Sequence, residues 1–195
     1  PLPLLLLHGW PGSISEFVEI IEPLAHPERF GADTDDSFTV IAPSLPGYGF
    51  SDSPSRPIGP KGMANLLSQL MTGVLGYKEY VVQGGDWGSI ISARIALEYS
   101  DGLKALHMNM TPIRPHLGSG APQLSHEEKE WLEIARKRRK SETGYQEIQG
   151  TKPQSIAYGL MDSPVGLAGW IVEKFHAWTD ENGPVPIFSM DQLLI

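Results

Sequence analysis

The segment Gln83-Gly84-Gly85-Asp86-Trp87-Gly88-Ser89 decides the fold of this chain. The apolar residues Tyr80-Val81-Val82 precede it and predict a strand, and residues 90–97 after it have a helical pattern. Small residues on both sides of the turn allow the strand and the helix to pack closely around one sharply turned residue. The segment therefore predicts a tight strand-to-helix turn with Asp86 at its tip.

A turn of this kind is a nucleophile elbow, and the turned residue in most enzymes that use it is serine. A serine hydroxyl needs an adjacent base before it attacks, whereas an aspartate side chain, with a reference pKa of about 3.9, is already ionised at pH 7. On a saturated carbon with a leaving group, a carboxylate forms an ester that water can hydrolyse. Asp86 thus indicates displacement at the carbon of an epoxide or an alkyl halide. The alternative is an aspartate that only caps the helix beginning near Trp87.

The bulk composition is that of an ordinary globular protein. The 195 residues are 41% hydrophobic and 19% charged, enough for one domain with a core or one domain with an insertion. A net charge of −8 argues against a nucleic-acid partner, and the basic run 136–140 follows several glutamates, as on a solvated helix face. The chain contains no cysteine, so thiolate chemistry is excluded. We expect neither a metal nor another cofactor.

No apolar run approaches the roughly 18 residues of a membrane span, so we predict no membrane segment in this chain. The opening residues 1–7 are short and lack a basic leader, so they are not read as a signal peptide. We expect a cytoplasmic protein, and leave open an anchor outside this chain.

Strands and helices alternate up to Asn109, and we predict strands at residues 4–7, 38–41, 80–82 and 103–108. This alternation predicts an α/β fold with a mostly parallel sheet and helices on both faces. After Asn109 the pattern becomes helical, with a capping box that begins at Ser125. We therefore predict two parts: residues 1–111 as the sheet domain and residues 112–195 as a helical lid.

Several segments, in this order, give the chain its resemblance to a known family. They are His8-Gly9-Trp10-Pro11-Gly12, residues 43–52, the elbow itself, Gly144-Tyr145 with Ile148-Gln149, residues 151–154 and residues 162–167. With them the chain resembles the epoxide hydrolases of the α/β-hydrolase fold, specifically the microsomal-type branch, nearly from end to end. The fold implied is an α/β-hydrolase core with a lid.

The resemblance also implies a role for each residue of the site. Asp86 would be the nucleophile that opens the epoxide and becomes esterified. Tyr145, in the lid, would donate its phenolic proton to the epoxide oxygen. The segment of His8, Gly9, Trp10 and Pro11 would form one wall of the oxyanion hole and bind the substrate. Backbone donors of this segment, with the N–H of Trp87, would stabilise the charge that forms when water attacks the ester. The family pattern further predicts a cis bond between Trp10 and Pro11.

The chain departs from the family pattern at its C-terminal end. The family completes its triad with an acidic residue and a late histidine, and none of the histidines here has that place: His8, His26, His107, His116, His126 and His176. A second lid tyrosine would also follow residue 195. We therefore expect a piece of a longer enzyme that lacks its first strands and its acid/His part, that is itself not competent for turnover, and that associates with the missing part or with copies of itself.

Two other functions stay open. A haloalkane dehalogenase shares the fold and the aspartate nucleophile, and Trp87 would suit it because its indole N–H could hold a halide. A non-catalytic binding module on the same fold would need no late histidine. For the epoxide hydrolase, the apolar lid residues predict a small hydrophobic epoxide as substrate; they are Leu160, Leu167, Trp170, Ile171, Phe175 and Trp178.

Overall fold

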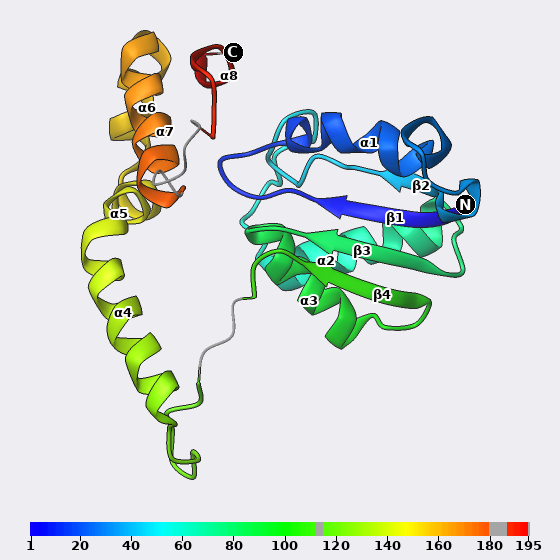
Figure 1. The fold of residues 1–195 in the computed structure, drawn as a ribbon, viewed down its shortest axis with the longest axis horizontal. Helices are drawn as coiled ribbons and strands as arrows, with labels where there is room; N and C mark the ends of the chain where they lie inside the picture. Colours follow the sequence, from blue (N-terminus) through cyan, green and yellow to red (C-terminus); the bar gives the residue numbers. More distant parts are fainter. Residues whose placement is uncertain (112–114, 180–186, 195) are drawn as a thin grey trace. The chain divides into compact units, whose positions relative to one another are not determined.

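The computed structural model describes residues 1–111, 115–179 and 187–194 (Figure 1). The chain forms two compact units, Pro1–Arg114 and Pro115–Ile195. The boundary expected after residue 111 stays a prediction, since residues 112–114 lie outside the described part.

The first unit is built on a four-stranded sheet. Its strands are β1 (Leu2–Leu7), β2 (Phe38–Ile41), β3 (Tyr80–Gly84) and β4 (Leu103–Met108). They lie in the order β2-β1-β3-β4, and every neighbouring pair is parallel. The four predicted strands and the parallel α/β fold are thus confirmed. β1 and β3 occupy the centre of the sheet, so the turns that follow these two strands lie next to each other at its carboxyl edge.

Three helices accompany the strands of this unit: α1 (Val18–Ala25), α2 (Pro60–Gln69) and α3 (Trp87–Glu98). α2 begins at Pro60, which occupies the first helical turn, where a missing N–H costs nothing. It continues as a π-helical turn over Leu70–Val74. α3 begins directly at the residue after Asp86, as the elbow predicts.

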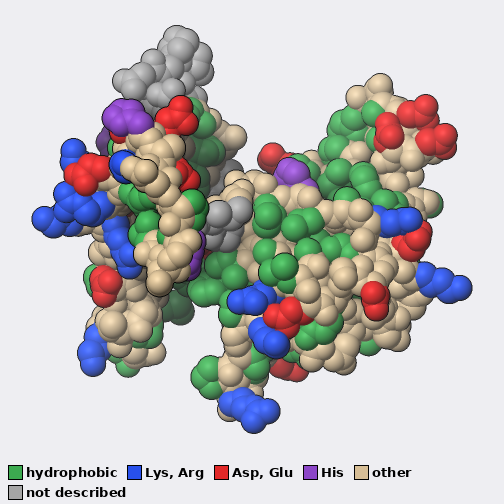
Figure 2. All heavy atoms as spheres, turned by 90° about the horizontal axis from the view of Figure 1, so that it is seen from below, with side chains coloured by type: hydrophobic (Ala, Val, Ile, Leu, Met, Phe, Trp, Pro, Cys, Tyr) green, Lys and Arg blue, Asp and Glu red, His purple; other side chains and the backbone are tan. Residues whose placement is uncertain are grey.

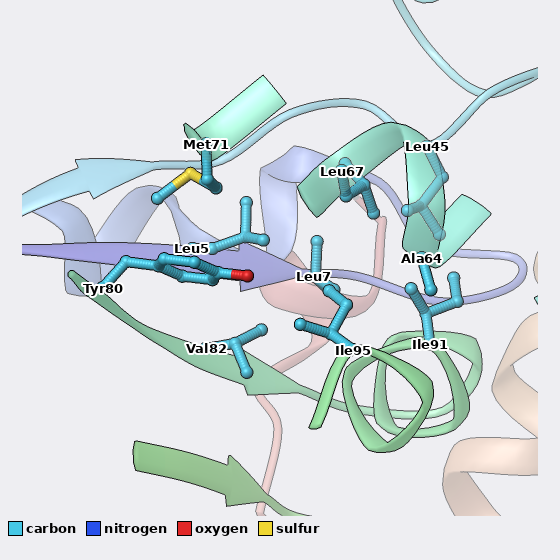
Figure 3. Packing of buried hydrophobic residues seen from close by; sticks show 10 residues of the cluster. All are labelled: Leu5, Leu7, Leu45, Ala64, Leu67, Met71, Tyr80, Val82, Ile91 and Ile95. Atoms are coloured by element: carbon cyan, nitrogen blue, oxygen red, sulfur yellow. The ribbon is translucent and has the colours of Figure 1, made fainter. Parts of the chain in front are cut away.

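The central strand β1 is buried on both faces, and its alternating side chains separate two clusters. Leu5 and Leu7 belong to the cluster that includes residues of α2 and α3 (Figure 3). Leu4 and Leu6 belong to the other cluster, with Phe17, and partly buried residues of α1 pack against it. Because successive side chains of a strand point to opposite faces, the continuous leucine run fixes β1 between helices on both sides.

Among its described residues, the second unit has helices and connecting loops but no strand. Its helices are α4 (His126–Glu142), α5 (Gly144–Thr151), α6 (Pro153–Asp162), α7 (Pro164–Trp178) and α8 (Met190–Leu194). The predicted capping box is confirmed, since the Ser125 hydroxyl accepts from the Glu128 N–H at 3.1 Å and the Glu128 carboxylate accepts from the Ser125 N–H at 2.7 Å. α6 packs against both α5 and α7.

The surface is charged in a mixed pattern. On the face drawn in Figure 2, basic side chains occur in small groups among acidic ones, with hydrophobic side chains between them. The basic residues 136–140 of α4 are all exposed, and Arg136 donates to Glu133 at 2.9 and 3.0 Å. Among the described residues, the structure contains no helix long and apolar enough to cross a membrane.

The packing of α3 against the core of the first unit can be tested with one buried and one exposed residue of this helix. Ile95 of α3 is fully buried, whereas Leu97, two residues later, is 75% exposed. Ile95→Ala should lower the free energy of unfolding by about 2–5 kcal/mol, the usual cost of a cavity in a packed core. Leu97→Ala should change it by less than about 0.5 kcal/mol. Urea unfolding of both variants measures the difference, and equal losses would contradict this packing.

Candidate active site

Asp86 lies at the tip of the turn between β3 and α3, with backbone angles φ 49° and ψ −121°. Among the described residues, it is the one non-glycine residue with a positive φ. Such a conformation costs of order 1–3 kcal/mol and persists only where the surrounding structure enforces it. The predicted strained elbow is therefore present.

The carboxylate of Asp86 does not cap α3. Asp86 occupies the N-cap position, but its side chain makes no capping hydrogen bond. Instead, its Oδ1 accepts from the backbone N–H of Trp10 at 2.8 Å. The residue is exposed. The side chain thus faces the segment after β1 and presents a carboxylate to solvent, which suits a nucleophile better than a helix cap.

Three glycines make this approach of the two turns sterically feasible. A Cβ on Gly9 would overlap the side chain of Asp86. A Cβ on Gly88 would overlap the carbonyl oxygens of Leu7 and His8, and one on Gly84 would overlap the backbone of Gly88. The end of β1 and the start of α3 therefore touch backbone to backbone, which is the physical reason for glycine at these positions.

The segment His8–Pro11 follows β1 and lies opposite the elbow. Its Trp10–Pro11 peptide bond is cis, which confirms the prediction made from the family pattern. Pro11 has no N–H to donate, so the donor that the segment directs at Asp86 is the N–H of Trp10. Trp87, on the other side of Asp86, is 43% exposed at the start of α3.

The side chain of His8 has a structural task. It is fully buried, and its Nε2 accepts from the Leu45 N–H at 3.0 Å. Its Nδ1 consequently carries the proton, and this N–H donates a hydrogen bond to the Gly9 carbonyl oxygen at 3.0 Å. The ring also meets Tyr48 edge-on, with centroids 5.2 Å apart. His8 therefore joins the segment after β1 to the loop after β2, and both of its nitrogens are occupied.

Together with burial, the negative charge of Asp86 raises the pKa values of two nearby residues, Tyr48 and Glu16. Burial and, secondarily, the charge of Asp86 raise the pKa of Tyr48, so this phenol stays protonated near neutral pH. Burial also raises the pKa of Glu16, while nearby His8 lowers it and Asp86 raises it. We did not foresee Glu16 from the sequence. The signal was its place three residues after Ser13, which is a capping-box spacing.

Tyr145 belongs to the second unit, near the start of α5. Its hydroxyl accepts from the Gln146 amide at 2.9 Å, and its ring meets that of Trp178 edge-on at 5.6 Å. The ammonium of Lys174 lies 5.6 Å from the centre of the Tyr145 ring. Tyr145, a residue of α5, thus packs its ring against α7 within the second unit. The catalytic role of Tyr145 stays a prediction.

The carboxylate of Glu142 contacts two of the residues around the Tyr145 ring, Trp178 and Lys174. Its Oε2 accepts from the Trp178 indole N–H at 3.1 Å and lies 3.3 Å from Lys174 Nζ. These two hydrogen bonds lower the pKa of Glu142, so it is ionised near neutral pH.

Among the described residues, no group of three or more His, Cys, Asp or Glu side chains is placed to hold a metal ion.

Comparison with known proteins places this geometry in a family. The model of the alpha/beta hydrolase fold family matches residues 3–147. A putative epoxide hydrolase of Stigmatella aurantiaca is 42% identical over 99% of this chain and 44% of its own length. Epoxide hydrolase 1 of Sus scrofa is 38% identical over 98% of this chain and 47% of its own. The chain therefore spans slightly less than half the length of these relatives.

A solved structure agrees with the sequence matches. The epoxide hydrolase of Aspergillus niger superimposes with a TM-score of 0.75 at 34% identity, over 99% of this chain and 49% of that one. The elbow, the parallel sheet and these likenesses lead to one conclusion: the chain belongs to the α/β-hydrolase fold family.

Proposed function

We propose that this protein acts as an epoxide hydrolase with Asp86 as its nucleophile. The observation that carries the proposal is the ionisable carboxylate at the tip of the elbow, held by the N–H of Trp10 at 2.8 Å. The names of the relatives, which are epoxide hydrolases in bacteria, mammals and fungi, support the same reaction.

In the first half-reaction, the free oxygen of Asp86 attacks one carbon of the epoxide ring. The bond between that carbon and the epoxide oxygen breaks, and its electron pair stays on the oxygen. Tyr145 donates its phenolic proton to this oxygen, because a developing alkoxide is basic enough to take it. The products are an ester at Asp86 with a free hydroxyl on the adjacent carbon, and a tyrosinate.

In the second half-reaction, water attacks the carbonyl carbon of the Asp86 ester. The negative charge then develops on Oδ1, the oxygen that already accepts from Trp10 in the free enzyme. A donor fixed before the reaction stabilises this charge without reorganisation, as in an oxyanion hole, and the N–H of Trp87 is the second proposed donor. Collapse breaks the bond between the carbonyl carbon of Asp86 and the ester oxygen joined to the substrate, releases a vicinal diol and restores the Asp86 carboxylate. The proton that the attacking water gives up reaches the Tyr145 tyrosinate through solvent and restores the phenol. His8 is not the base in this proposal, because both of its ring nitrogens are already engaged.

The substrate class follows from the apolar residues of the second unit. Leu167, Ile171, Phe175 and Trp178 are between 37% and 46% exposed along α7, at spacings that place them on one side of the helix. A partly exposed apolar stripe in the unit that holds Tyr145 favours a hydrophobic epoxide over a polar one.

In the full-length enzyme, Asp86→Ala should abolish diol formation, because no other group forms the ester. Asp86→Asn should recover slowly as the amide is hydrolysed in place. Gas chromatography of the diol from styrene oxide measures both, with the exposed Asp101→Ala as control. Substantial diol from the Asp86→Ala variant would rule out the nucleophile.

Tyr145→Phe should slow ester formation by roughly 10- to 100-fold. This is at the low end of general-acid effects, because the second lid tyrosine that the family pattern predicts would also donate a proton. Ester hydrolysis should stay nearly unchanged, since it needs no proton at the epoxide oxygen. Rapid-quench measurement of the ester separates the two steps. Tyr158→Phe on α6, where the side chain is 69% exposed, is the matched control.

Trp87 favours one second candidate, a haloalkane dehalogenase, because its partly exposed indole follows the nucleophile directly. Incubation of the full-length enzyme with 1-bromobutane and with styrene oxide discriminates between the two reactions. We expect diol from the epoxide and no halide release above background. Halide release that exceeds diol formation would reverse the assignment.

A further inference from the structure

We propose that Lys174 is a positioning residue for Tyr145: its ammonium, anchored by Glu142, holds the phenol ring in the orientation from which Tyr145 donates its proton. This inference rests on the proposed function, because it concerns the general acid of the same epoxide opening. Neither Lys174 nor Glu142 belongs to the segments that give the chain its family resemblance.

The ammonium of Lys174 lies close to two aromatic rings. Its Nζ is 5.6 Å from the centre of the Tyr145 ring and 5.4 Å from the centre of the Trp178 ring. Both distances are within the roughly 6 Å at which a ring attracts a cation. The two rings also meet each other edge-on, with centroids 5.6 Å apart. The Tyr145 ring therefore contacts a cation and a second ring, and these contacts limit its rotation.

Glu142 fixes both of these partners of Tyr145. Its Oε2 accepts from the Lys174 ammonium at 3.3 Å and from the Trp178 indole N–H at 3.1 Å. Lys174 and Trp178 are one turn apart on α7, whereas Glu142 is the last residue of α4, three residues before Tyr145. One carboxylate thus ties α7 to the chain directly before α5, where Tyr145 is located.

The hydroxyl of Tyr145 is held in a way that suits a proton donor. It accepts from the Gln146 amide at 2.9 Å, and a bond in which the hydroxyl is the acceptor does not use its proton. A general acid must lie within hydrogen-bond reach of the atom that it protonates, so its orientation matters first. A ring that is fixed before the reaction meets this condition without losing further rotational freedom at the moment of proton transfer.

The simpler interpretation is a surface ion pair. Lys174 also lies 2.8 Å from Glu173, and an exposed pair of this kind contributes little. The side chains of Lys174 and Glu142 are, however, only 21% and 25% exposed, whereas Lys137 on α4 is 73% exposed and lies 3.9 Å from Glu133. An ion pair alone also does not explain why the Glu142 carboxylate holds the indole that packs against Tyr145.

The experiment uses variants of the full-length enzyme. Lys174→Ala removes the cation from the Tyr145 ring, and Lys137→Ala is the matched control at an exposed site of the same unit. Lys174→Arg keeps a cation that also stacks on aromatic rings. Each variant is made with and without Tyr145→Phe and mixed with styrene oxide. Rapid quench with peptide mass mapping follows the formation and decay of the ester at Asp86.

Lys174→Ala should slow ester formation by roughly five- to tenfold and leave ester decay unchanged, because the phenol is needed only in the first step. Lys174→Arg and Lys137→Ala should both stay within about twofold of the wild type. In the Tyr145→Phe background, Lys174→Ala should cause no further slowing, because a ring without a hydroxyl has no proton to position. A general loss of structure would instead slow both backgrounds equally.

A second matched pair of variants tests the anchor. Glu142→Ala releases both Lys174 and Trp178, so it should slow ester formation in the same direction as Lys174→Ala. Glu173→Ala removes the other carboxylate beside Lys174, whose side chain is 57% exposed, and should leave the rate unchanged. Equal slowing by the two glutamate variants would contradict Glu142 as the anchor.

The inference would be overturned by equal slowing from Lys174→Ala with and without the Tyr145 hydroxyl. A Lys174→Arg variant no faster than Lys174→Ala, or a Lys174→Ala variant as fast as Lys137→Ala, would overturn it as well. These results would leave the Asp86 nucleophile standing, because the ester would still map to Asp86. The absence of any ester at Asp86 in the wild-type protein, despite diol formation, would instead overturn the proposed function and the inference with it.

Discussion

The close contact between the end of β1 and the start of α3 is the constraint on which the site depends. Gly88 allows the backbone of α3 to reach the carbonyl oxygens of Leu7 and His8, and Gly9 leaves space for the side chain of Asp86. Without this contact the Trp10 N–H would not reach Asp86 Oδ1 at 2.8 Å. The strained backbone of Asp86 is held by the same contact, because strand and helix leave the turn no room to relax.

The segment after β1 is organised around polar groups that each hold one position. The buried imidazole of His8 ties its start to Leu45 in the loop after β2, and the Asp86 carboxylate accepts from its middle. A Cβ on Gly12 would overlap Glu16 Oε1, so the Glu16 side chain lies against the same segment. Backbone donors placed in this way are ready before any negative charge develops, and this preorganisation, rather than the number of contacts, gives such a site its catalytic value.

The sequence was sufficient for most of the fold, because the signals there are local. The leucine run of β1, the elbow glycines and the Ser125 capping box each specify their element directly, and the structure has all three. The buried role of His8 could not be predicted in the same way, because it depends on the N–H of Leu45, which lies far away in the chain.

The parallel order of the sheet has a consequence for folding kinetics. β1 pairs with β3 across most of the length of the first unit, and the bond between Trp10 and Asp86 joins residues 76 positions apart. Pairings of this sequence separation form slowly, because a long loop must close before they contribute any stability. The two halves of the site therefore meet only once the centre of the sheet is assembled. Until then Asp86 has no enforced conformation, so the reactive geometry arises at the end of folding rather than in an early local turn.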